Sequence, residues 1–279
     1  MSIAGLFTIT RPLNSIAAGL AALVAYLIAT GTIIPQVLLL CAIVSLITAA
    51  GNVINDYFDV EIDRVNRPDR PIPSGQVGLP AARAYSVTLF LAAILICIFT
   101  NELCIAIAIF NSVLLVGYAV WLKRMPLFGN IAVSYLAASM FLFGGAFDGL
   151  PGLLNIIPFA VITFFAMLAR ELVKDAEDVD GDRASGAVTI PIRYGIKATT
   201  LLALSSALLG IIASMIPGQR WGFWYICGIL LVDGVILYAS MKAVRCTTPE
   251  GVKRSGASNL LKAGMFASLL VFALSAVFL

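Results

Sequence analysis

The chain has 279 residues, of which 61% are hydrophobic and only 12% are charged, and its formal net charge is +3. Its mean hydropathy of +1.00 is far above that of soluble globular domains, so the composition excludes an ordinary water-soluble protein. The sequence contains no histidine, which excludes histidine proton relays, histidine metal sites and haem ligation by histidine.

Nine apolar runs follow one another along the chain, each close to the about 20 residues that a helix needs to cross the hydrocarbon of a bilayer. They are too long and too free of polar alternation to be barrel strands, and they leave no room for a separate soluble domain. The sequence therefore predicts an all-α polytopic membrane protein, a bundle of nine transmembrane helices that forms a single domain over residues 1–279. The runs lie at 13–34, 36–57, 84–101, 103–122, 127–147, 153–173, 198–216, 221–241 and 259–279.

Positive charges concentrate on one side of these predicted spans when the chain is allowed to alternate across the membrane. Of the 18 Lys and Arg residues, 17 fall on the side that holds the N-terminal segment and the connections near 58–83, 123–126, 170–197 and 242–258, and only Arg220 falls on the other side. Because the side rich in Lys and Arg is normally cytoplasmic, we expect a cytoplasmic N-terminus and a C-terminus on the opposite side. The charged connections would then form a mouth that faces the cytoplasm.

Acidic residues gather in two segments, 56–69 and 171–182, which hold eleven of the 15 Asp and Glu residues. In the first segment Asn55, Asp59 and Asp63 recur every four residues, so they share one face of a helix. Asn52 and Asp56 extend the same helical spacing.

The second acidic segment repeats this arrangement, with Asp175, Asp178 and Asp182 at helical spacing. The two clusters lie 119 residues apart, each at the end of an even-numbered span on the positively charged side. This parallel resembles an internal duplication, although the intervening sequence shows no clear repeat.

Two rows of carboxylates that share one opening would repel each other, so either they take up protons or divalent cations bridge them. Mg²⁺ is suited to such a site, because it accepts one or two carboxylates together with waters and phosphate oxygens. We therefore expect a Mg²⁺-diphosphate site, in which acids hold the metal ions and arginines hold the anion. The alternative is that the acidic clusters belong to a solvated membrane face with weak surface ion pairs. Two matching clusters argue against this alternative more strongly than a single cluster would.

The motif N55-D56-x-x-D59-x-x-x-D63, followed by RPIPSG at 70–75, resembles the UbiA superfamily of intramembrane prenyltransferases. The D178-x-x-x-D182 motif and the R11-P-L-N14 start strengthen the resemblance, which covers essentially the whole chain. Within the superfamily the two motif strings look most like the archaeal digeranylgeranylglyceryl phosphate synthases, with chlorophyll synthase-like members as the nearest neighbours.

The resemblance implies Mg²⁺-dependent transfer of a prenyl group from an allylic diphosphate to an acceptor in the membrane. In the archaeal branch the donor is geranylgeranyl diphosphate, the acceptor is geranylgeranylglyceryl phosphate, and the product carries the second ether bond of archaeal membrane lipid. The implied partners are the isoprenoid diphosphate, the lipid acceptor and the bilayer, with no nucleic acid and no obligatory protein partner.

Roles follow from the resemblance position by position. It implies two Mg²⁺ ions, one at the first motif and one at the second, with metal-binding residues Asn55, Asp56, Asp59, Asp63, Asp175, Asp178 and Asp182. The implied catalytic residues are Asp59, Asp63, Asp178, Asp182, Tyr118 and Lys123. The implied substrate-binding residues are Arg11, Asn14, Asn52, Arg67, Arg70, Arg124 and Lys174.

One pair departs from the family pattern. Tyr118 and Lys123 stand five residues apart, whereas quinone-pathway members of the superfamily commonly have a gap of four. Whether Lys123 or Arg124 reaches the leaving group is therefore open at this stage.

Other functions stay open as alternatives to ether-lipid synthesis. An aromatic acceptor of a quinone or chlorophyll-type pathway would use the same donor chemistry, and a more remote alternative is a membrane transporter with internal symmetry. Asp233, alone in the middle of the eighth run, either faces a cavity or bonds a neighbouring helix.

Overall fold

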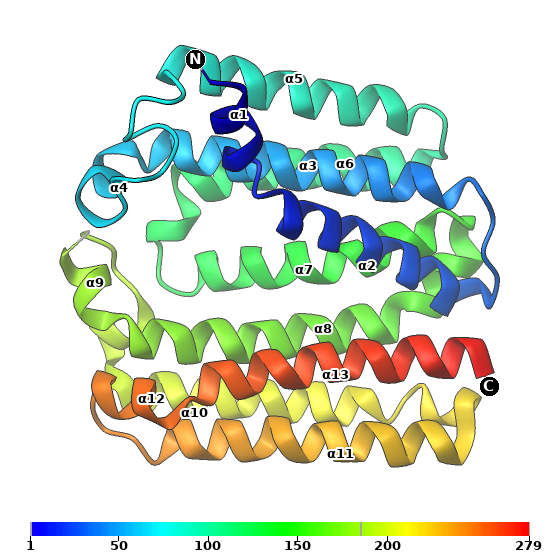
Figure 1. Cartoon of the computed structure of the whole chain (residues 1–279). Coiled ribbons are helices and arrows are strands. Elements are labelled where there is room, and N and C mark those ends of the chain that lie inside the picture. Colours follow the sequence, from blue (N-terminus) through cyan, green and yellow to red (C-terminus); the bar gives the residue numbers. More distant parts are fainter. Residues whose placement is uncertain (1, 185, 279) are drawn as a thin grey trace. The chain divides into compact units, whose positions relative to one another are not determined.

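The computed structural model describes residues 2–184 and 186–278, and this part of the chain is helical with no β-strand (Figure 1). Nine helices in the described part are long and apolar enough to cross a membrane, as the composition predicts. These helices are α2 (Pro12–Thr30), α3 (Val37–Phe58), α5 (Leu79–Cys97), α6 (Glu102–Val120), α7 (Phe128–Ala146), α8 (Gly149–Glu177), α10 (Ile190–Ser214), α11 (Gly218–Val244) and α13 (Ala257–Phe278).

Short helices occupy the connections. They are α1 (Ile3–Ile9), α4 (Val60–Asn66), the 3₁₀ turn η1 (Leu122–Arg124), α9 (Val179–Ala184) and α12 (Pro249–Ser255). Two of them, α4 and α9, carry the carboxyl-terminal parts of the two acidic motifs. The predicted fold class, an all-α membrane protein with nine spans, is therefore confirmed.

The chain divides into two compact units, one formed by residues 1–122 and 139–154 and the other by residues 123–138 and 155–279. Each unit is described by itself below. The prediction that residues 1–279 act as a single domain with one shared mouth stays a prediction.

In the first unit α3 is the central helix, and α2, α5 and α6 pack against it (Figure 1). Its buried side chains include Leu40 and Ile43, both fully shielded from solvent. Gly19 of α2 lies so close to α3 that an added Cβ would stand 2.6 Å from the backbone oxygen of Cys41. Glycine thus permits the close approach of these two helices.

The short helix α1 is fixed to the connection between α4 and α5. The Ser2 amide donates to the Gln76 carbonyl at 2.9 Å, and Ile9 is buried in a small core with Val53 and Val77. The segment ahead of α2 is therefore part of the packed unit rather than a loose extension of the first span.

In the second unit α11 packs against α10 and α13. Aromatic side chains link three helices, because Phe159 of α8 contacts Trp221 of α11 and Phe272 of α13 with ring centroids 4.8 and 4.9 Å apart. Gly195 interrupts α10 with a φ of 83°, so the apolar part of that helix starts close to the predicted start at residue 198.

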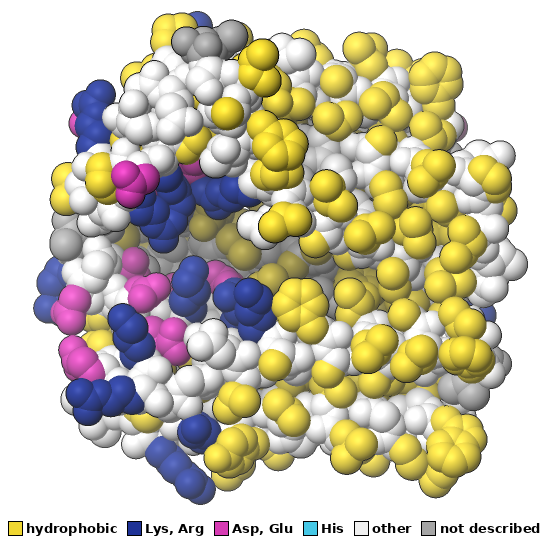
Figure 2. Space-filling view, in the orientation of Figure 1, with side chains coloured by type: hydrophobic (Ala, Val, Ile, Leu, Met, Phe, Trp, Pro, Cys, Tyr) yellow, Lys and Arg dark blue, Asp and Glu magenta, His cyan; other side chains and the backbone are white. Residues whose placement is uncertain are grey.

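Charged side chains gather near one end of each unit, around α4 in the first and α9 in the second, while hydrophobic side chains cover the rest of the face in Figure 2. Exposed apolar side chains such as Leu95, Leu231 and Phe266 belong to spans and fit contact with lipid.

Candidate active site

The first acidic motif lies on a nearly continuous helix that is broken only at Asp59, between α3 and α4. The Asp59 amide donates to the Asn55 carbonyl at 3.0 Å, and the Asp63 amide donates to the Asp59 carbonyl at 2.8 Å. Helical bonding therefore continues through the break, and the three side chains lie one turn apart as the spacing predicts. The Asn55 side-chain nitrogen also donates to Asp59 Oδ2 at 2.9 Å.

Two arginines neutralise the other carboxylates of this cluster. Arg11 donates to Asp56 Oδ1 at 2.6 Å, and Arg70 donates to the same oxygen at 3.0 Å. Arg70 also donates to Asp63 Oδ2 at 2.6 Å. Since the Asp56 and Asp63 side chains are only 4% and 6% exposed, these ion pairs supply the partners that buried charges need.

The backbone around Arg11 is shaped to present its side chain. Arg11 adopts left-handed angles, with φ of 50° and ψ of 64°, in the sharp turn between α1 and α2. Asn52 holds this turn, because its side-chain nitrogen donates to the Thr10 carbonyl at 3.0 Å. The predicted substrate residue Asn52 is therefore engaged with the protein backbone in this structure.

The second acidic motif repeats the broken helix, with the break at Asp178 between α8 and α9. The Asp178 amide donates to the Lys174 carbonyl at 3.0 Å, and the Asp182 amide donates to the Asp178 carbonyl at 2.9 Å. Asn130, at the start of α7, donates its side-chain nitrogen to Asp175 Oδ2 at 2.8 Å.

Asp182 lies outside the membrane-spanning helices, and its surroundings affect its ionisation. Burial raises the pKa of the Asp182 carboxyl above its ordinary value, although the nearby Thr189 hydroxyl and the charge of Lys174 act in the opposite direction. The neighbouring Asp178 carboxylate also raises this pKa. A cation at this position would therefore relieve an unfavourable charge.

Asn130 was not among the residues expected from the sequence. A signal existed, since Asn130 follows Arg11 by 119 residues, the separation that relates the two acidic motifs. Polar partners of a motif aspartate can be sought at that separation even where their residue types differ.

The other expected residues are distributed over both units. Tyr118 lies in the last turn of α6, while Lys123 and Arg124 lie in η1. Arg67 follows the last residue of α4, and Asn14 lies in the first turn of α2; both side chains are exposed. The structure brings Arg11 and Arg70 to the first cluster, whereas the predicted roles of the others stay predictions.

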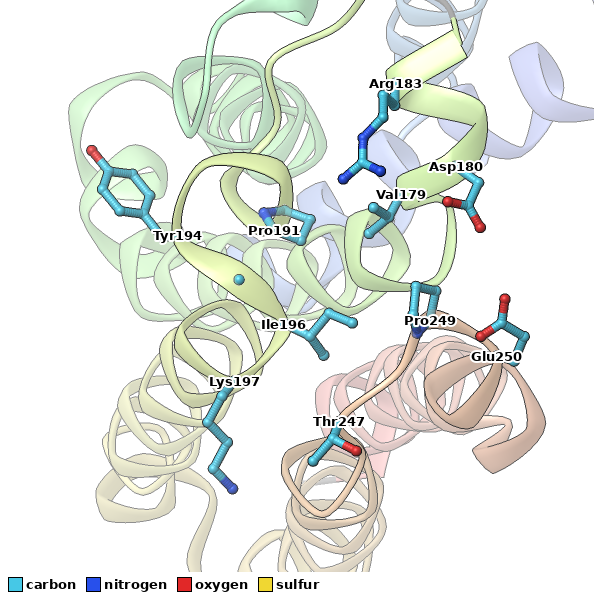
Figure 3. Close-up of a pocket in the computed structure, with 11 residues that line it drawn as sticks. Val179, Asp180, Arg183, Pro191, Tyr194, Ile196, Lys197, Thr247, Pro249 and Glu250 are labelled. Carbon is cyan, nitrogen blue, oxygen red and sulfur yellow. The ribbon is translucent and has the colours of Figure 1, made fainter.

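A pocket of about 870 Å³ in the second unit lies beside α9 (Figure 3). Arg183 lines it together with Asp180 and Glu250, and Lys197 uses its ammonium group to donate to the Val244 carbonyl at 2.7 Å. In Figure 3 the Arg183 guanidinium points toward Pro191 and Val179. Because its two carboxylates offset its cations, we assign this pocket no part in binding the donor.

Oxygen atoms are the available metal ligands in both motifs. Within the described residues no three His, Cys, Asp or Glu side chains are grouped closely enough to hold a metal ion unaided. However, Asn55 Oδ1 is buried without a hydrogen-bond partner, next to the Asp59 carboxylate. An orphaned amide oxygen beside a carboxylate fits Mg²⁺, which needs few protein ligands when phosphate oxygens and waters complete its shell.

Together these features define a polytopic membrane protein with paired carboxylate motifs and arginines near the ends of its spans. The model of the UbiA prenyltransferase family matches residues 17–277, and the chain belongs to this family. It is therefore a membrane-embedded prenyltransferase, as the motif resemblance implies.

Three known proteins match this chain over nearly its whole length. The digeranylgeranylglyceryl phosphate synthase of Methanoregula boonei is 58% identical over 279 residues, which is all of both chains. A solved structure concerning digeranylgeranylglyceryl phosphate synthase in membranes is 32% identical, covers 99% of both chains and has a TM-score of 0.88. A UbiA homologue from Archaeoglobus fulgidus, solved with DMAPP and Mg²⁺, shares the fold at 16% identity, with a TM-score of 0.68 over 95% of this chain and 99% of that one.

Proposed function

We propose that this protein transfers a geranylgeranyl group from geranylgeranyl diphosphate to geranylgeranylglyceryl phosphate, which forms the second ether bond of an archaeal membrane lipid. The observation that carries this proposal is the 58% identity over the entire length to a relative named for that synthesis. The paired motifs, each with carboxylates stacked by helical bonding, support the same chemistry.

The residues suited to hold two Mg²⁺ ions are Asn55, Asp59 and Asp63 in the first unit and Asp178 and Asp182 in the second, with Asp175 as a helper. When bound, these ions supply Lewis-acid stabilisation of the charge that develops on the departing diphosphate. The oxygen-only ligand sets and the orphaned Asn55 oxygen support this assignment.

The arginines of the first cluster serve the anion. Arg11 and Arg70 are fixed by buried carboxylates, so their remaining N–H groups are held ready to donate to diphosphate oxygens without further ordering. Lys123, or its neighbour Arg124, would add positive charge at the leaving group, and Tyr118 on α6 is the other residue to which the family resemblance gives a catalytic role.

The apolar spans serve the prenyl chain. Loss of diphosphate from an allylic donor leaves a carbocation that any nearby water would quench, so the site must exclude solvent. Helices that expose apolar side chains provide such surroundings, and each buried CH₂ of the tail contributes roughly 0.8 kcal/mol. The glycerol hydroxyl of the acceptor then needs little activation beyond correct placement.

The topology completes the proposal. A cytoplasmic N-terminus, an opposite C-terminus and a cytoplasm-facing mouth would let both substrates enter from the side where the motifs lie. The bias of Lys and Arg toward that side supports this orientation.

A reconstituted assay tests the function. Purified protein is incubated with labelled geranylgeranyl diphosphate, Mg²⁺ and a panel of acceptors that contains geranylgeranylglyceryl phosphate and an aromatic quinone precursor. We expect an ether-linked product only from the glyceryl phosphate and its loss when a chelator is added. A C-prenylated aromatic product would instead favour the aromatic alternative, and equal turnover with chelator would contradict the metal mechanism.

A further inference from the structure

The two acidic motifs share one register and one backbone design. Asp59 and Asp178, 119 residues apart, each occupy the single position between a long span and a short helix. In both places the helical amide-to-carbonyl bonds continue across the break. The units can therefore be compared residue by residue although each is described by itself.

The hydrogen-bond partners of the first aspartate in each motif, Asp56 and Asp175, follow the same separation of 119 residues. In the first unit Arg11 bonds Asp56, and in the second unit Asn130 bonds Asp175. The two partners lie 119 residues apart, as do the two aspartates. One position of the design thus holds a guanidinium in the first unit and a neutral amide in the second.

The position that corresponds to Arg70 shows the same difference. Arg70 bonds Asp63, and the residue 119 positions after Arg70 is the neutral Thr189. At the positions that correspond to both arginines of the first unit, the second unit therefore has the neutral residues Asn130 and Thr189. The first unit thus has a guanidinium at each of these two partner positions, while the second unit has a neutral side chain at both.

Asp56 is the residue on which both guanidiniums converge. Its Oδ1 accepts from Arg11 and from Arg70, and its side chain is only 4% exposed. A metal ion that took this oxygen would leave two arginines with one fewer buried partner, which is costly. Asn55 Oδ1, by contrast, is buried and has no hydrogen bond to lose.

We propose that Asp56 is a positioning residue, which holds Arg11 and Arg70 toward the donor diphosphate, and that it is not a ligand of Mg²⁺. The guanidiniums of the first unit then serve the diphosphate of the donor, and Asp56 serves the guanidiniums. This inference rests on the proposed prenyl-transfer function and assigns a separate task to one residue of its first motif.

The test separates metal binding from anion binding in the Asp56→Asn variant. The binding of inorganic diphosphate and the KM for geranylgeranyl diphosphate are measured at saturating Mg²⁺, together with Mn²⁺ binding by electron paramagnetic resonance. We expect Asp56→Asn to weaken diphosphate binding and raise the KM about tenfold, equivalent to about 1.4 kcal/mol, with Mn²⁺ affinity unchanged. Asp59→Asn should show the opposite result, with weaker Mn²⁺ binding and unchanged binding of inorganic diphosphate.

A double-mutant cycle shows whether Asp56 acts through the arginine. Arg11→Gln and Asp56→Asn are combined, and diphosphate binding by the double variant is compared with that by each single variant. If Asp56 works by holding Arg11, the double variant loses much less than the sum of the two single losses. Additive losses, or a fall in Mn²⁺ affinity in Asp56→Asn alone, would overturn the proposal.

Two controls make a negative result interpretable. Asp56→Glu retains the charge and should restore part of the diphosphate affinity, which distinguishes a lost ion pair from a misfolded unit; a Glu variant no better than the Asn variant would count against the proposal. Glu61→Gln removes an acid of the same segment that pairs with the exposed Arg64, and it should leave the binding of diphosphate and of Mn²⁺ unchanged. If the wild-type protein fails to turn over geranylgeranyl diphosphate, the proposed function fails; if it turns over and Asp56→Asn behaves as a metal-site variant, only this inference fails.

Discussion

Asp59 and Glu61 stand two positions apart in the same acidic segment but have different surroundings. Asp59 lies at the helix break and accepts from Asn55, whereas Glu61 is 76% exposed and pairs with the exposed Arg64. An exposed ion pair contributes little, while a carboxylate held by an amide is oriented. The difference lets the two residues serve as a matched pair for mutagenesis.

We predict that Asp59→Asn lowers turnover by at least about 100-fold, because it would remove a negative ligand that we propose for the metal that stabilises the departing diphosphate. Glu61→Gln should change turnover by less than about two-fold. Initial rates with labelled donor at saturating Mg²⁺ check both. Near-normal turnover of Asp59→Asn would contradict the assignment of Asp59 to the metal.

Asn130 provides a second prediction at this scale. Asn130→Ala removes the donor to Asp175 and should lower both activity and thermal stability, with an expected loss of about 1 kcal/mol for one hydrogen bond. Asn130→Asp should cost more, because it places a second carboxylate against the first. Unfolding in detergent, followed by fluorescence, together with turnover gives the ranking. An Asp variant more stable than the Ala variant would contradict the role given to this amide.

The part of the site that could be predicted from the sequence is the part that depends on local helix geometry. The spacing of Asn55, Asp59 and Asp63 implies stacking on one helix face, because helical periodicity is a local property. The pairing of Arg11 with Asp56 joins residues 45 apart, and the pairing of Asn130 with Asp175 does the same, so it depends on how separate helices pack. Such contacts cannot be derived from spacing alone.

At the scale of elements, apolar length predicts the number of spans but not their polar ends. The sixth span was expected to end at residue 173, yet α8 continues to Glu177 and carries Asp175 within it. Hydropathy falls where charged residues begin, although the backbone remains helical as long as its bonds are satisfied. The acidic motif is therefore partly embedded in the end of a span.

The contact of α2 with α3 yields a stability prediction. Gly19→Ala places a Cβ 2.6 Å from the Cys41 carbonyl, so the helices must separate, at a cost of roughly 1–3 kcal/mol. Gly117→Ala in α6 is the matched control, because nothing lies within 4 Å of its added Cβ, and it should not destabilise the protein. Thermal unfolding of the two purified variants gives the comparison; equal midpoints would contradict tight packing at Gly19.

The hairpin of α10 and α11 contains the acid that the sequence left with two interpretations. Ser214 Oγ of α10 lies 2.7 Å from Asp233 Oδ2 of α11 in a hydrogen bond, and the Tyr225 hydroxyl donates to the Ser214 carbonyl at 2.8 Å. The structure thus shows the interpretation in which Asp233 bonds a neighbouring helix. Its polar group has a partner at membrane depth, where an unpaired one is costly.

We predict that Asp233→Leu destabilises the protein by about 1 kcal/mol, in the range measured for hydrogen bonds between membrane helices. Asp233→Asn should retain most of the stability, since its side chain can still bond Ser214. Leu231→Ala, at a side chain that is 77% exposed, serves as the control. Denaturation in mild detergent measures the order; a stable Leu variant would indicate that the hydrogen bond contributes nothing.

At the scale of the whole molecule, an odd number of spans would place the two termini on opposite sides of the membrane, as we propose. The described part of the chain contains nine such helices, and their connections divide Lys and Arg unevenly. The class of protein and its multi-pass character were therefore predictable from composition. The branch of the family was accessible only through the long motif strings, because composition is shared by many membrane enzymes.

Orientation can be tested by cysteine labelling in a background without the five native cysteines. Gln219→Cys, in the first turn of α11, should react with a membrane-impermeant thiol reagent on intact cells. Lys253→Cys, in α12, should react only after the membrane is permeabilised. The reverse pattern would contradict the cytoplasmic assignment of the acidic motifs.

The fixation of α1 has a practical meaning for anyone who expresses this enzyme. Ser2 and Ile9 are engaged in packing, and Arg11 follows only two residues after Ile9. An affinity tag or fluorescent protein joined directly to the start of the chain would press on the segment that carries Arg11, whose guanidinium we propose to bind the donor diphosphate. Fusions should therefore be made after α13, and N-terminally tagged preparations should show reduced donor affinity even when they are correctly inserted.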